Sequence, residues 1–375
     1  MTVGLVTTSY PQFAGDPSGH FVQGHALALA RPVEVLCAGV GDQPPSPLIT
    51  VTRIPAHPSL FYAGGAPDAL ERAAPRTLLA AAAFSARLTA AVARRARRWD
   101  AIIAHWLAPA ALAALPTHLP LLAIAHGGDI HTLRRLHLLA PTLHLLRLRR
   151  ARLAFVSAEL LAIARLAAPA SRALQAYLDT AIVQPMGLDV AHFAALARAP
   201  TTPPTLLVVA RLTPIKGVDI ALAALAHLHT PAHLVIAGAG PEHAALVALA
   251  AAAPPHVAVT FVGAVTTTGR DALLARTSVV VIPSRTLPSG RAEGTPVIAL
   301  EALAAGIPVV AAATGGLRAL APAVTLVPPE HPALLAAAID QALVAPSSAE
   351  VRRAAVAHLD WSRVASVLAA TQLSA

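Results

Sequence analysis

Short apolar segments alternate with longer stretches of helical periodicity along the whole chain. This alternation is typical of βαβ units around a parallel sheet. In the first half, the predicted strands are Val3–Thr8, Val33–Cys37, Ala101–Ala104, Leu121–Ala125, Leu153–Val156 and Ala181–Gln184. In the second half, they are Thr205–Val209, His233–Ala237, Val257–Phe261, Ser278–Ile282, Pro308–Ala311 and Val324–Val327. Each set makes one doubly wound sheet, so the fold class is α/β with two Rossmann-like domains.

The two predicted sheets are separated by the polar, Pro-rich segment Arg198–Pro204, which is expected to be the linker. The length of 375 residues is also that of two domains. We therefore expect an N-terminal domain over 1–190 and a C-terminal domain over 198–359. A last helix, over about 360–375, is expected to pack back on the first domain.

The composition, 56% hydrophobic and 13% charged, excludes an intrinsically disordered chain. The mean hydropathy of +0.62 is high, but much of it comes from Ala. No charge-free apolar run reaches the roughly 20 residues that span a bilayer, and Leu78–Val92 is interrupted by Arg87. The start MTVGLVTTSY does not resemble a signal peptide. A cytoplasmic protein is expected, and the lone Cys37 excludes a disulfide framework or a multi-cysteine zinc site.

The net charge of +9 is uneven, being +7 up to Val190 and +2 beyond it. The excess lies mostly in two arginine clusters, within Arg87–Arg98 and Arg134–Arg152. Such clusters can bind an anionic membrane surface, or they can be solvated helix faces, and the sequence leaves both open. Nucleic-acid binding is not expected, because three Tyr and three Trp provide little surface for base stacking.

Several common catalytic motifs are missing from the sequence. It contains no G-x-x-x-x-G-K-[ST] phosphate loop, no G-x-G-x-x-G after the first strand, no D-x-D pair and no H-E-x-x-H. A simple NAD enzyme and a P-loop kinase therefore have no support.

Two basic residues follow the predicted strand Thr205–Val209, in the segment Ala210–Gly217. Arg211 and Lys216 are thereby placed at the carboxyl end of a strand, where open α/β sheets bind ligands. Lys216 is the only lysine among 28 basic residues, and its compact ammonium suits a phosphate contact. The alternative is a surface lysine that stands at a helix start by chance.

Two further loops of the second half carry candidate ligand contacts. Gly238 and Gly240 follow a strand, and glycines there would allow a ligand close to the backbone. Glu293 and Glu301 are eight residues apart, the first in a loop and the second in an otherwise uncharged helix. A lone carboxylate in such a helix needs a partner, and a ribose diol could supply it. The free amides of Gly294–Val297 could hold a sugar or phosphate oxygen.

These segments together resemble family 4 retaining glycosyltransferases of the GT-B fold, in which two such domains face each other across a cleft. The resemblance rests on E-G-T-P-V-I-A-L-E at Glu293–Glu301, A-R-L-T-P-I-K-G at Ala210–Gly217 and G-I-P-V-V-A with T-G-G from Gly306 to Gly316. The bacterial polysaccharide branch is indicated by Pro283–Pro296, Ala104–Pro109, Ala125–Ile130 and the loop Phe13–Ala28. Gln184–Asp189 stands where the family usually has P-N-G-V-D. Met186 departs from the usual Asn, and Ala210 from a frequent Gly.

The resemblance implies a role for each matching residue. Arg211 and Lys216 would neutralise the diphosphate of a nucleotide sugar, Glu301 would hold its ribose, and Glu293 would hold its sugar. His126 would face the donor sugar, so the implied catalytic set is His126, Glu293, Arg211 and Lys216. Donor contacts would also come from Gly238, Gly240, Pro283, Ser284, Gly294, Thr295, Pro296 and Val297. The acceptor side would hold Gly19, His20, Gln23, His105 and Asp129. The long loop Thr286–Arg291 leaves the positions of Arg285 and Arg291 open.

The implied reaction is transfer of a sugar from a nucleotide sugar to a glycan or glycolipid acceptor, with retention, without cofactor and without metal. Preplaced cations stabilise the leaving diphosphate electrostatically. Two alternatives remain, a nucleotide-sugar 2-epimerase of similar fold and a non-catalytic sugar-nucleotide binding protein. A pyridoxal-phosphate phosphorylase is disfavoured, because the only lysine is already assigned.

Overall fold

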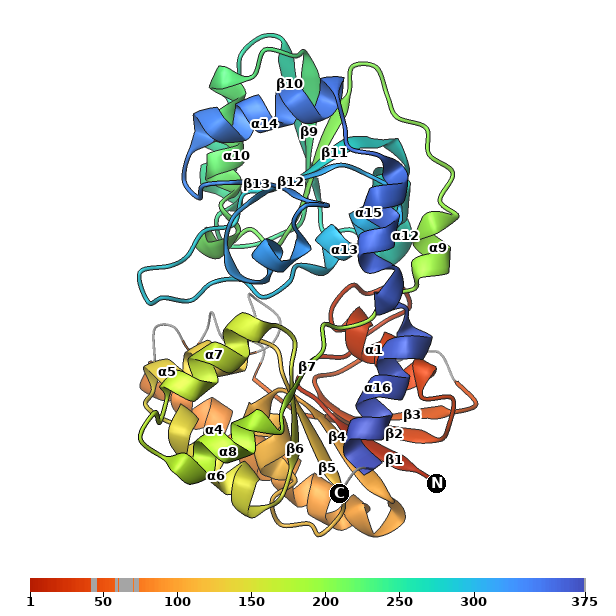
Figure 1. Cartoon of the computed structure of the whole chain (residues 1–375), viewed down its shortest axis with the longest axis vertical. Helices are drawn as coiled ribbons and strands as arrows, with labels where there is room; N and C mark the ends of the chain where they lie inside the picture. Colours follow the sequence, from red (N-terminus) through yellow and green to blue (C-terminus); the bar gives the residue numbers. More distant parts are fainter. Residues whose placement is uncertain (42–45, 58–59, 61–69, 71–73, 374–375) are drawn as a thin grey trace. The chain divides into compact units, whose positions relative to one another are not determined.

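The computed structural model describes residues 1–41, 46–57, 60, 70 and 74–373. The chain forms two compact units, whose elements are drawn in Figure 1. Unit 1 comprises Met1–Gly187 and the C-terminal segment from Trp361, and unit 2 comprises Leu188–Asp360. The Pro-rich segment Arg198–Pro204 therefore lies inside unit 2 and is not the connection between the units. It is fixed there because Ala199 N donates to Ala275 O at 2.9 Å, and the Arg198 guanidinium donates to Thr277 O at 2.5 Å.

Unit 1 contains a seven-stranded sheet in the order β3-β2-β1-β4-β5-β6-β7. All neighbouring strands are parallel. The strands are β1 (Val3–Val6), β2 (Val33–Ala38), β3 (Ile49–Ile54), β4 (Ala101–His105), β5 (Leu121–Ala125), β6 (Arg152–Phe155) and β7 (Ile182–Val183). Edge strand β3 was not predicted. Its sequence ITVTRI carries Thr and Arg at positions that an edge strand exposes in part, so it lacks the continuous apolar run of the central strands.

The helices of unit 1 in the described residues are α1 (His20–Ala28), α4 (Pro75–Arg95), α5 (Gly128–Arg135), α6 (Leu139–Leu148), α7 (Ala158–Leu166), α8 (Arg172–Asp179) and α16 (Trp361–Leu373). Helix α16, from the end of the chain, packs on α1 and on β5 and β6 (Figure 1). The Trp361 ring packs directly against the backbone of Gly24 and Gly187. A Cβ would lie 2.3 Å from the ring at Gly24 and 2.5 Å from it at Gly187, so only glycine fits at these positions. These two glycines therefore fix the C-terminal helix on unit 1.

Unit 2 contains a six-stranded parallel sheet in the order β10-β9-β8-β11-β12-β13. Its strands are β8 (Thr205–Val209), β9 (Ala232–Ala237), β10 (Val257–Gly263), β11 (Thr277–Ile282), β12 (Val309–Ala312) and β13 (Thr325–Val327). Its helices are α9 (Val190–Ala194), α10 (Val218–Ala224), α11 (His243–Ala250), α12 (Thr267–Arg276), α13 (Val297–Ala304), α14 (Pro332–Val344) and α15 (Ala349–Val356). All six predicted strands of this half are present, each within a few residues of its predicted bounds.

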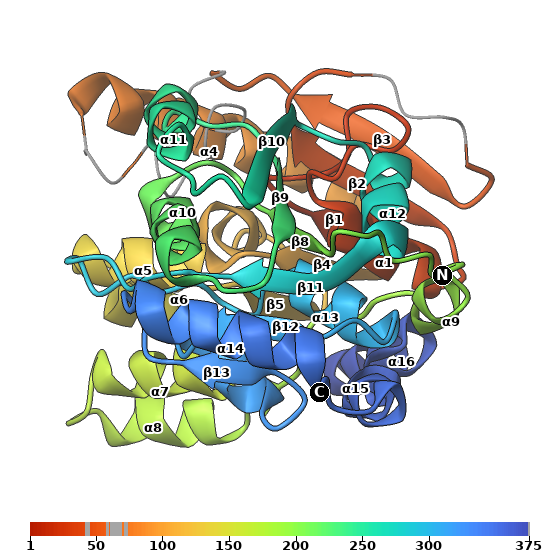
Figure 2. The ribbon, with the colours of Figure 1, turned by 90° about the horizontal axis from the view of Figure 1, so that it is seen from above.

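The apolar runs of the central strands follow from burial on both faces of the sheet. Leu206 and Val208 pack with α10, α11 and α14, whereas Leu207, between them, packs with α9, α12 and α13. The same alternation occurs along β11. Figure 2 shows these two helical layers on either side of the second sheet. The inner positions of these central strands, Leu206–Val209 and Val279–Ile282, are therefore continuously apolar, which is why the sequence revealed the strands clearly.

Helix α4 is the segment that carries most of the first arginine cluster. By length and composition alone, Pro75–Arg98 is the one stretch among the described residues that could cross a membrane. Of its larger apolar residues, Phe84, Leu88 and Val92 are buried in the core of unit 1, whereas Leu78 and Leu79 are exposed. The side of α4 that carries Phe84, Leu88 and Val92 therefore faces the core of unit 1, and its exposed side carries mostly Ala and Arg together with Leu78 and Leu79.

Some arginines of the second cluster are structural. The Arg149 guanidinium donates to Leu119 O at 2.5 Å and to Thr117 Oγ1 at 3.2 Å, and Arg135 donates to Leu70 O. These contacts join segments of unit 1, so only part of the basic excess remains for other partners.

Gly4 in the central strand β1 is required by the packing of Trp99. A Cβ at Gly4 would lie 2.1 Å from the Trp99 ring, and Trp99 is only 4% exposed. The indole Nε1–H donates to Glu34 Oε2 at 2.8 Å, and Arg95 donates to Glu34 Oε1 at 2.7 Å. The ring therefore cannot move without breaking a partly buried polar cluster.

We expect Gly4→Ala to destabilise unit 1 by about 1–3 kcal/mol, the usual cost of overpacking a core. Trp99, Trp106 and Trp361 are the three tryptophans of the chain and all lie in unit 1, so urea unfolding followed by tryptophan fluorescence reports on this unit alone. Gly269→Ala, in unit 2 where the added Cβ meets only ordinary contacts beginning at 3.4 Å, is the control. Equal midpoints for Gly4→Ala and wild type would contradict this account of Gly4.

Candidate functional site

The carboxyl ends of β8 and β11 bring three predicted residues together in unit 2. Lys216 Nζ forms an ion pair with Glu293 Oε1, and the Ser284 hydroxyl donates to Glu293 Oε2 at 2.6 Å. The side chains of Lys216 and Glu293 are only 18% and 13% exposed. A carboxylate and an ammonium that are far apart in sequence thus form one partly buried polar cluster, as the parallel sheet predicts.

Glycines around this cluster allow the loops themselves to approach one another. A Cβ at Gly217 would lie 2.1 Å from Pro283 O, and one at Gly315 would lie 1.7 Å from Glu293 O. Gly238 and Gly240 approach the backbone of Ala210 and Leu212 in the same way, at 1.8 Å and 2.3 Å. The glycines that we assigned to ligand approach therefore fit neighbouring loops together, and any contact of theirs with a donor stays a prediction.

Three arginines near the cluster have different environments. Arg211 is exposed in the loop that follows β8. Arg285, whose position the sequence left open, donates to Asp219 at 2.6 Å and lies 3.4 Å from Glu330 Oε1. Arg291 is buried at 7% exposure. Of these three arginines, only Arg211 is exposed to solvent.

Glu301 lies in α13, which begins at Val297 with Pro296 as its N-cap. Its carboxylate is 2% exposed and accepts a 2.6 Å hydrogen bond from Arg270 of α12. The expectation that a carboxylate in this apolar helix needs a partner is thus met inside the protein. Burial of Glu301 alone no longer points to a ligand, and its role with a ribose remains a prediction.

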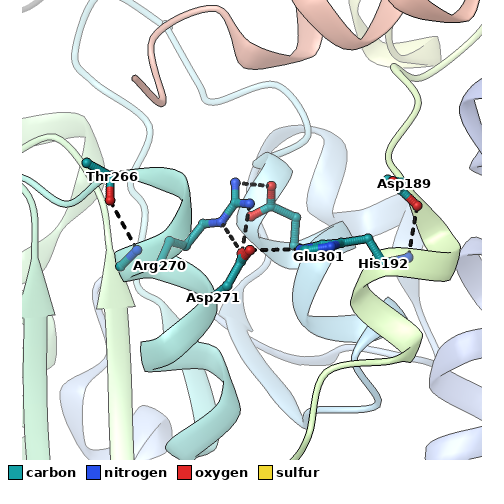
Figure 3. A network of polar contacts seen from close by, with 7 residues as sticks. Asp189, His192, Thr266, Arg270, Asp271 and Glu301 are labelled. Atoms are coloured by element: carbon teal, nitrogen blue, oxygen red, sulfur yellow. Dashed lines mark hydrogen bonds and ion pairs between the residues drawn. The ribbon is translucent and has the colours of Figure 1, made fainter. Parts of the chain in front are cut away.

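A chain of polar contacts continues from Glu301 toward the start of unit 2 (Figure 3). The Arg270 guanidinium also donates to Asp271 Oδ1, at 2.9 Å from Nη2 and 3.2 Å from Nε, and it lies 5.1 Å from the Phe193 ring centroid. Asp271 Oδ2 lies 2.8 Å from His192 Nε2, in α9. Sequence reasoning missed Arg270, although it is a basic residue on the same helix face as buried Leu274, four positions later.

Asp129 organises the corresponding edge of unit 1. Its carboxylate accepts hydrogen bonds from Leu107 N at 2.7 Å, His126 N at 3.1 Å, Gly127 N at 3.0 Å and Ile130 N at 2.9 Å. Burial raises the pKa of Asp129, and the four N–H donors oppose that rise. We expected Asp129 to help form the acceptor side. At 5% exposure it joins the loops after β4 and β5 instead of presenting a free carboxylate.

Three histidines of unit 1, one of them next to the Asp129 loop, form a chain of hydrogen-bonded rings. His25 Nδ1 lies 3.0 Å from His105 Nε2, and His105 Nδ1 lies 2.9 Å from His126 Nε2. Burial lowers the pKa of His25 to about 4 and that of His126 to about 3. The pKa of His105 is held well below its usual value by burial and by its two histidine neighbours. All three rings are therefore neutral at pH 7.

His25 was not predicted, although its position in α1 carried a signal. It lies three residues after Val22 and one before Ala26, and these three form the buried side of the helix. A histidine on a buried helix face needs a polar partner, and here that partner is His105. Its ring also stacks on Trp361, at 5.8 Å between centroids and 7° between planes.

Aromatic side chains surround the outer end of the histidine chain. The His126 ring centroid lies 5.2 Å from that of Phe21 and 4.8 Å from that of Trp106. Trp106 has φ 76° and ψ 135°, a backbone conformation that is strained for a bulky residue. It is held there because Trp106 N donates to Ile124 O at 2.8 Å and Asp129 holds the next amide. Strain of this kind concentrates at functional sites.

The other predicted acceptor-side residues lie at the start of α1. Gly19 has φ 70°, and a Cβ there would come within 2.7 Å of the Ser9 backbone. His20 Nδ1 lies 2.7 Å from Pro17 O. His20 and Gln23 are partly exposed, so they remain candidates for a contact with substrate, whereas Gly19 is required by the local backbone. Among the described residues, no group of three or more His, Cys, Asp or Glu is arranged to hold a metal ion.

A comparison with protein-family models matches residues 194–356 to the family described as Glycosyl transferases group 1. The matched segment includes Lys216, Ser284, Glu293 and Glu301. Residues 194–356, less than half of the chain, are thus similar to a group 1 glycosyltransferase domain. The resemblance drawn from the sequence is confirmed at this level, while membership of family 4 within the group stays a prediction.

Relatives with assigned functions align with part of the chain. Glycogen synthase of Mycobacterium tuberculosis is 39% identical over 201 residues, which are 50% of this chain and 47% of the relative. A GDP-mannose-dependent alpha-(1-6)-phosphatidylinositol monomannoside mannosyltransferase of the same organism is 39% identical over 117 residues, 30% of each chain. The chain thus spans about half the length, or less, of these relatives.

Solved structures resemble the chain over its whole length. HepE of Anabaena, solved with UDP and glucose, has a TM-score of 0.71 at 19% identity, and the alignment covers 100% of this chain and 99% of the HepE chain. The trehalose-6-phosphate synthase OtsA has a TM-score of 0.74 at 14% identity, with coverage of 100% and 99%. The predicted GT-B fold, with two Rossmann-like sheets, is confirmed.

The histidine chain of this glycosyltransferase-like protein predicts acid sensitivity of unit 1. Because the folded-state pKa values lie below the unfolded value of about 6.5, protons bind the unfolded chain better. Stability should therefore fall as the pH drops from about 6.5 towards 4, by about 1.4 kcal/mol per pH unit for each histidine. Urea unfolding followed by tryptophan fluorescence at several pH values measures this slope. His25→Phe removes one of the three titrating rings, so the slope should fall by about 1.4 kcal/mol per pH unit. An unchanged slope would contradict the lowered pKa of His25.

The Arg270–Glu301 pair predicts a marked non-additivity in unit 2. Arg270→Met removes the guanidinium that binds the buried Glu301 carboxylate and should cost about 3–5 kcal/mol. The double variant Arg270→Met/Glu301→Gln should recover most of that loss. Urea unfolding followed by far-UV circular dichroism measures the coupling, with exposed Arg276→Met on the same helix as control. Additive losses would show that the pair is not coupled.

Proposed function

We propose that this protein is a retaining glycosyltransferase that moves a sugar from a nucleotide-diphosphate sugar to a lipid-linked or polysaccharide acceptor without a metal ion. The observation that supports this most directly is the Lys216–Glu293–Ser284 cluster at the carboxyl edge of the group 1 domain. It combines a cation for phosphate with a carboxylate for sugar hydroxyls, on loops that meet at one edge.

The charges that develop in the reaction explain the residue types. Breaking the bond between sugar and phosphate leaves positive charge at the anomeric carbon and negative charge on the diphosphate. Lys216 and Arg211 would stabilise the leaving diphosphate, the task that a divalent cation has in D-x-D enzymes. Because Lys216 is already paired with Glu293, the diphosphate would share or displace that contact. Glu293, held by Ser284, would then hold the sugar hydroxyls.

The nature of the donor is supported by relatives of this fold. HepE was solved with UDP and glucose, and one curated relative is named as GDP-mannose-dependent. Both are consistent with a nucleotide-diphosphate sugar, and they differ in base and sugar. We therefore assign the donor class and leave the base and the sugar to be measured.

In the proposed enzyme, retention would follow a front-face route. The donor phosphate would accept the proton of the acceptor hydroxyl, because no carboxylate is assigned as a nucleophile. His126 would face the donor sugar. Asp129 would act on the site only through the loops that it holds, since its carboxylate is used by four backbone amides.

A lipid-linked acceptor would require approach to an anionic membrane surface. The residues available for this are arginines at the end of α4, where Arg94, Arg97 and Arg98 are exposed. Since Phe84, Leu88 and Val92 of α4 are buried in unit 1, such a contact would be mainly electrostatic and would weaken with salt.

A nucleotide-sugar 2-epimerase is the second candidate, and a non-catalytic binding protein is the third. Both could use the same cationic loop, but the epimerase would change the sugar without any acceptor. The pairing of Glu293 with Lys216 and Ser284 is compatible with all three. The product therefore decides between them.

Lys216→Met should lower turnover of the donor by about 10²-fold or more, because a preplaced charge at the leaving group is lost. Release of nucleoside diphosphate from a panel of nucleotide sugars measures this, with exposed Arg276→Met as control. EDTA should leave the wild-type rate unchanged. Full turnover in Lys216→Met would refute the assigned role, and strict dependence on an added divalent ion would refute the metal-free mechanism.

A further inference from the structure

The histidine chain of unit 1 has two ends with different surroundings. His25 belongs to α1, His105 ends β4, and His126 follows β5. His25 and His105 are each 0% exposed, whereas His126 is partly exposed. His126 is therefore the ring through which the chain can meet a ligand, and the contact with His105 uses its Nε2.

The two contacts restrict where the protons can be. A neutral imidazole carries one N–H and one acceptor nitrogen, and each contact needs one N–H. If His25 is protonated on Nδ1, then His105 and His126 must be as well, and protonation of His25 on Nε2 likewise fixes the other two. Only two neutral arrangements satisfy both contacts, with Nδ1–H on all three rings or Nε2–H on all three.

The buried end distinguishes the two arrangements. His25 Nε2 is buried and has no hydrogen-bond partner among the residues that the structure describes. With Nε2–H on every ring, an N–H group would be buried there without an acceptor. With Nδ1–H on every ring, only an acceptor lone pair is left, and orphaned buried N–H groups are the rarer of the two. The stack on Trp361 covers the face of the ring and offers no in-plane partner.

We propose that His25 and His105 are positioning residues that fix His126 in its Nδ1–H tautomer, so that His126 donates a hydrogen bond to an oxygen of its ligand. A ring without these neighbours would exchange between both tautomers and would be a donor only part of the time. That the oxygen belongs to a nucleotide sugar rests on the proposed function. The tautomer does not rest on it.

The tautomer can be read directly from the ring nitrogens. In protein labelled with ¹⁵N at histidine, long-range ¹H–¹⁵N spectra at pH 7 should show Nδ1–H and an unprotonated Nε2 for all three rings. Variants that lack one histidine each assign the signals. Nε2–H at His126, different tautomers along the chain, or a charged ring at pH 7 would each overturn the proposal. No substrate is needed, so the result stands even if no sugar transfer is found.

Disconnecting the chain tests the positioning role. His105→Phe removes both contacts and should leave His126 with both tautomers populated, whereas exposed His118→Phe should leave the His126 signals unchanged. A single Nδ1–H tautomer of His126 in His105→Phe would show that its neighbours do not set it. If His105→Phe does not fold, the wild-type spectra still decide the tautomer.

The reaction provides a second reading, provided that wild type transfers sugar. His105→Phe should lower kcat/KM by about 10-fold, the value of one hydrogen bond. The double variant His105→Phe/His126→Phe should lose no more than His126→Phe alone, because His105 acts through His126. If the losses in kcat/KM of the two single variants add up in the double variant, His105 does not act through His126. Absence of transfer by wild type would contradict the proposed function alone.

Discussion

The cost of burying an ionisable group without a partner governs the candidate sites of both units. In a chain with only 13% charged residues, each such group has a specific solution. Glu301 is paired with Arg270, Glu293 with Lys216, and Asp129 with four backbone amides. The three histidines are kept neutral and bind one another. Because an unpaired group would cost several kcal/mol, these pairings decide which loops lie together at each sheet edge.

Close loop packing is the second condition for these sites. The loops after β8, β9, β11 and β12 approach so closely that Gly217, Gly238, Gly240 and Gly315 leave no room for a side chain. Such fixed loops leave the charged groups around Glu293 little freedom to rearrange. The charges are therefore already in position before a ligand binds. In unit 1 the same effect is reached differently, since Asp129 joins the loop after β4, which contains the strained Trp106, to the loop after β5, which contains His126.

The sequence was sufficient for the fold because the central strands are buried on both faces and therefore appear as continuous apolar runs. It failed at β3, an edge strand with polar positions, and at Arg198–Pro204, where composition resembles a linker but backbone contacts place the segment within unit 2. Among candidate site residues, it indicated Lys216, Glu293, His105 and His126 through motifs next to strand ends, and the structure places these four in two polar clusters. It missed Arg270 and His25, which lie on helices and whose importance comes from a partner distant in sequence. Periodicity can show that such a residue is buried, but not what it binds.

The choice between arginine and lysine follows from the geometry of each pairing. Arg270 uses Nη1 for Glu301 and both Nε and Nη2 for Asp271, so one planar guanidinium serves two carboxylates while its face lies over Phe193. A lysine has no such fork and could not hold both acceptors in these directions. Lys216 has the opposite task. It meets one oxygen of a carboxylate whose other oxygen is taken by Ser284, and a compact charge with rotatable donors can also turn toward a phosphate. The local geometry therefore suits a lysine at this position, just as the two carboxylates around Arg270 suit an arginine there.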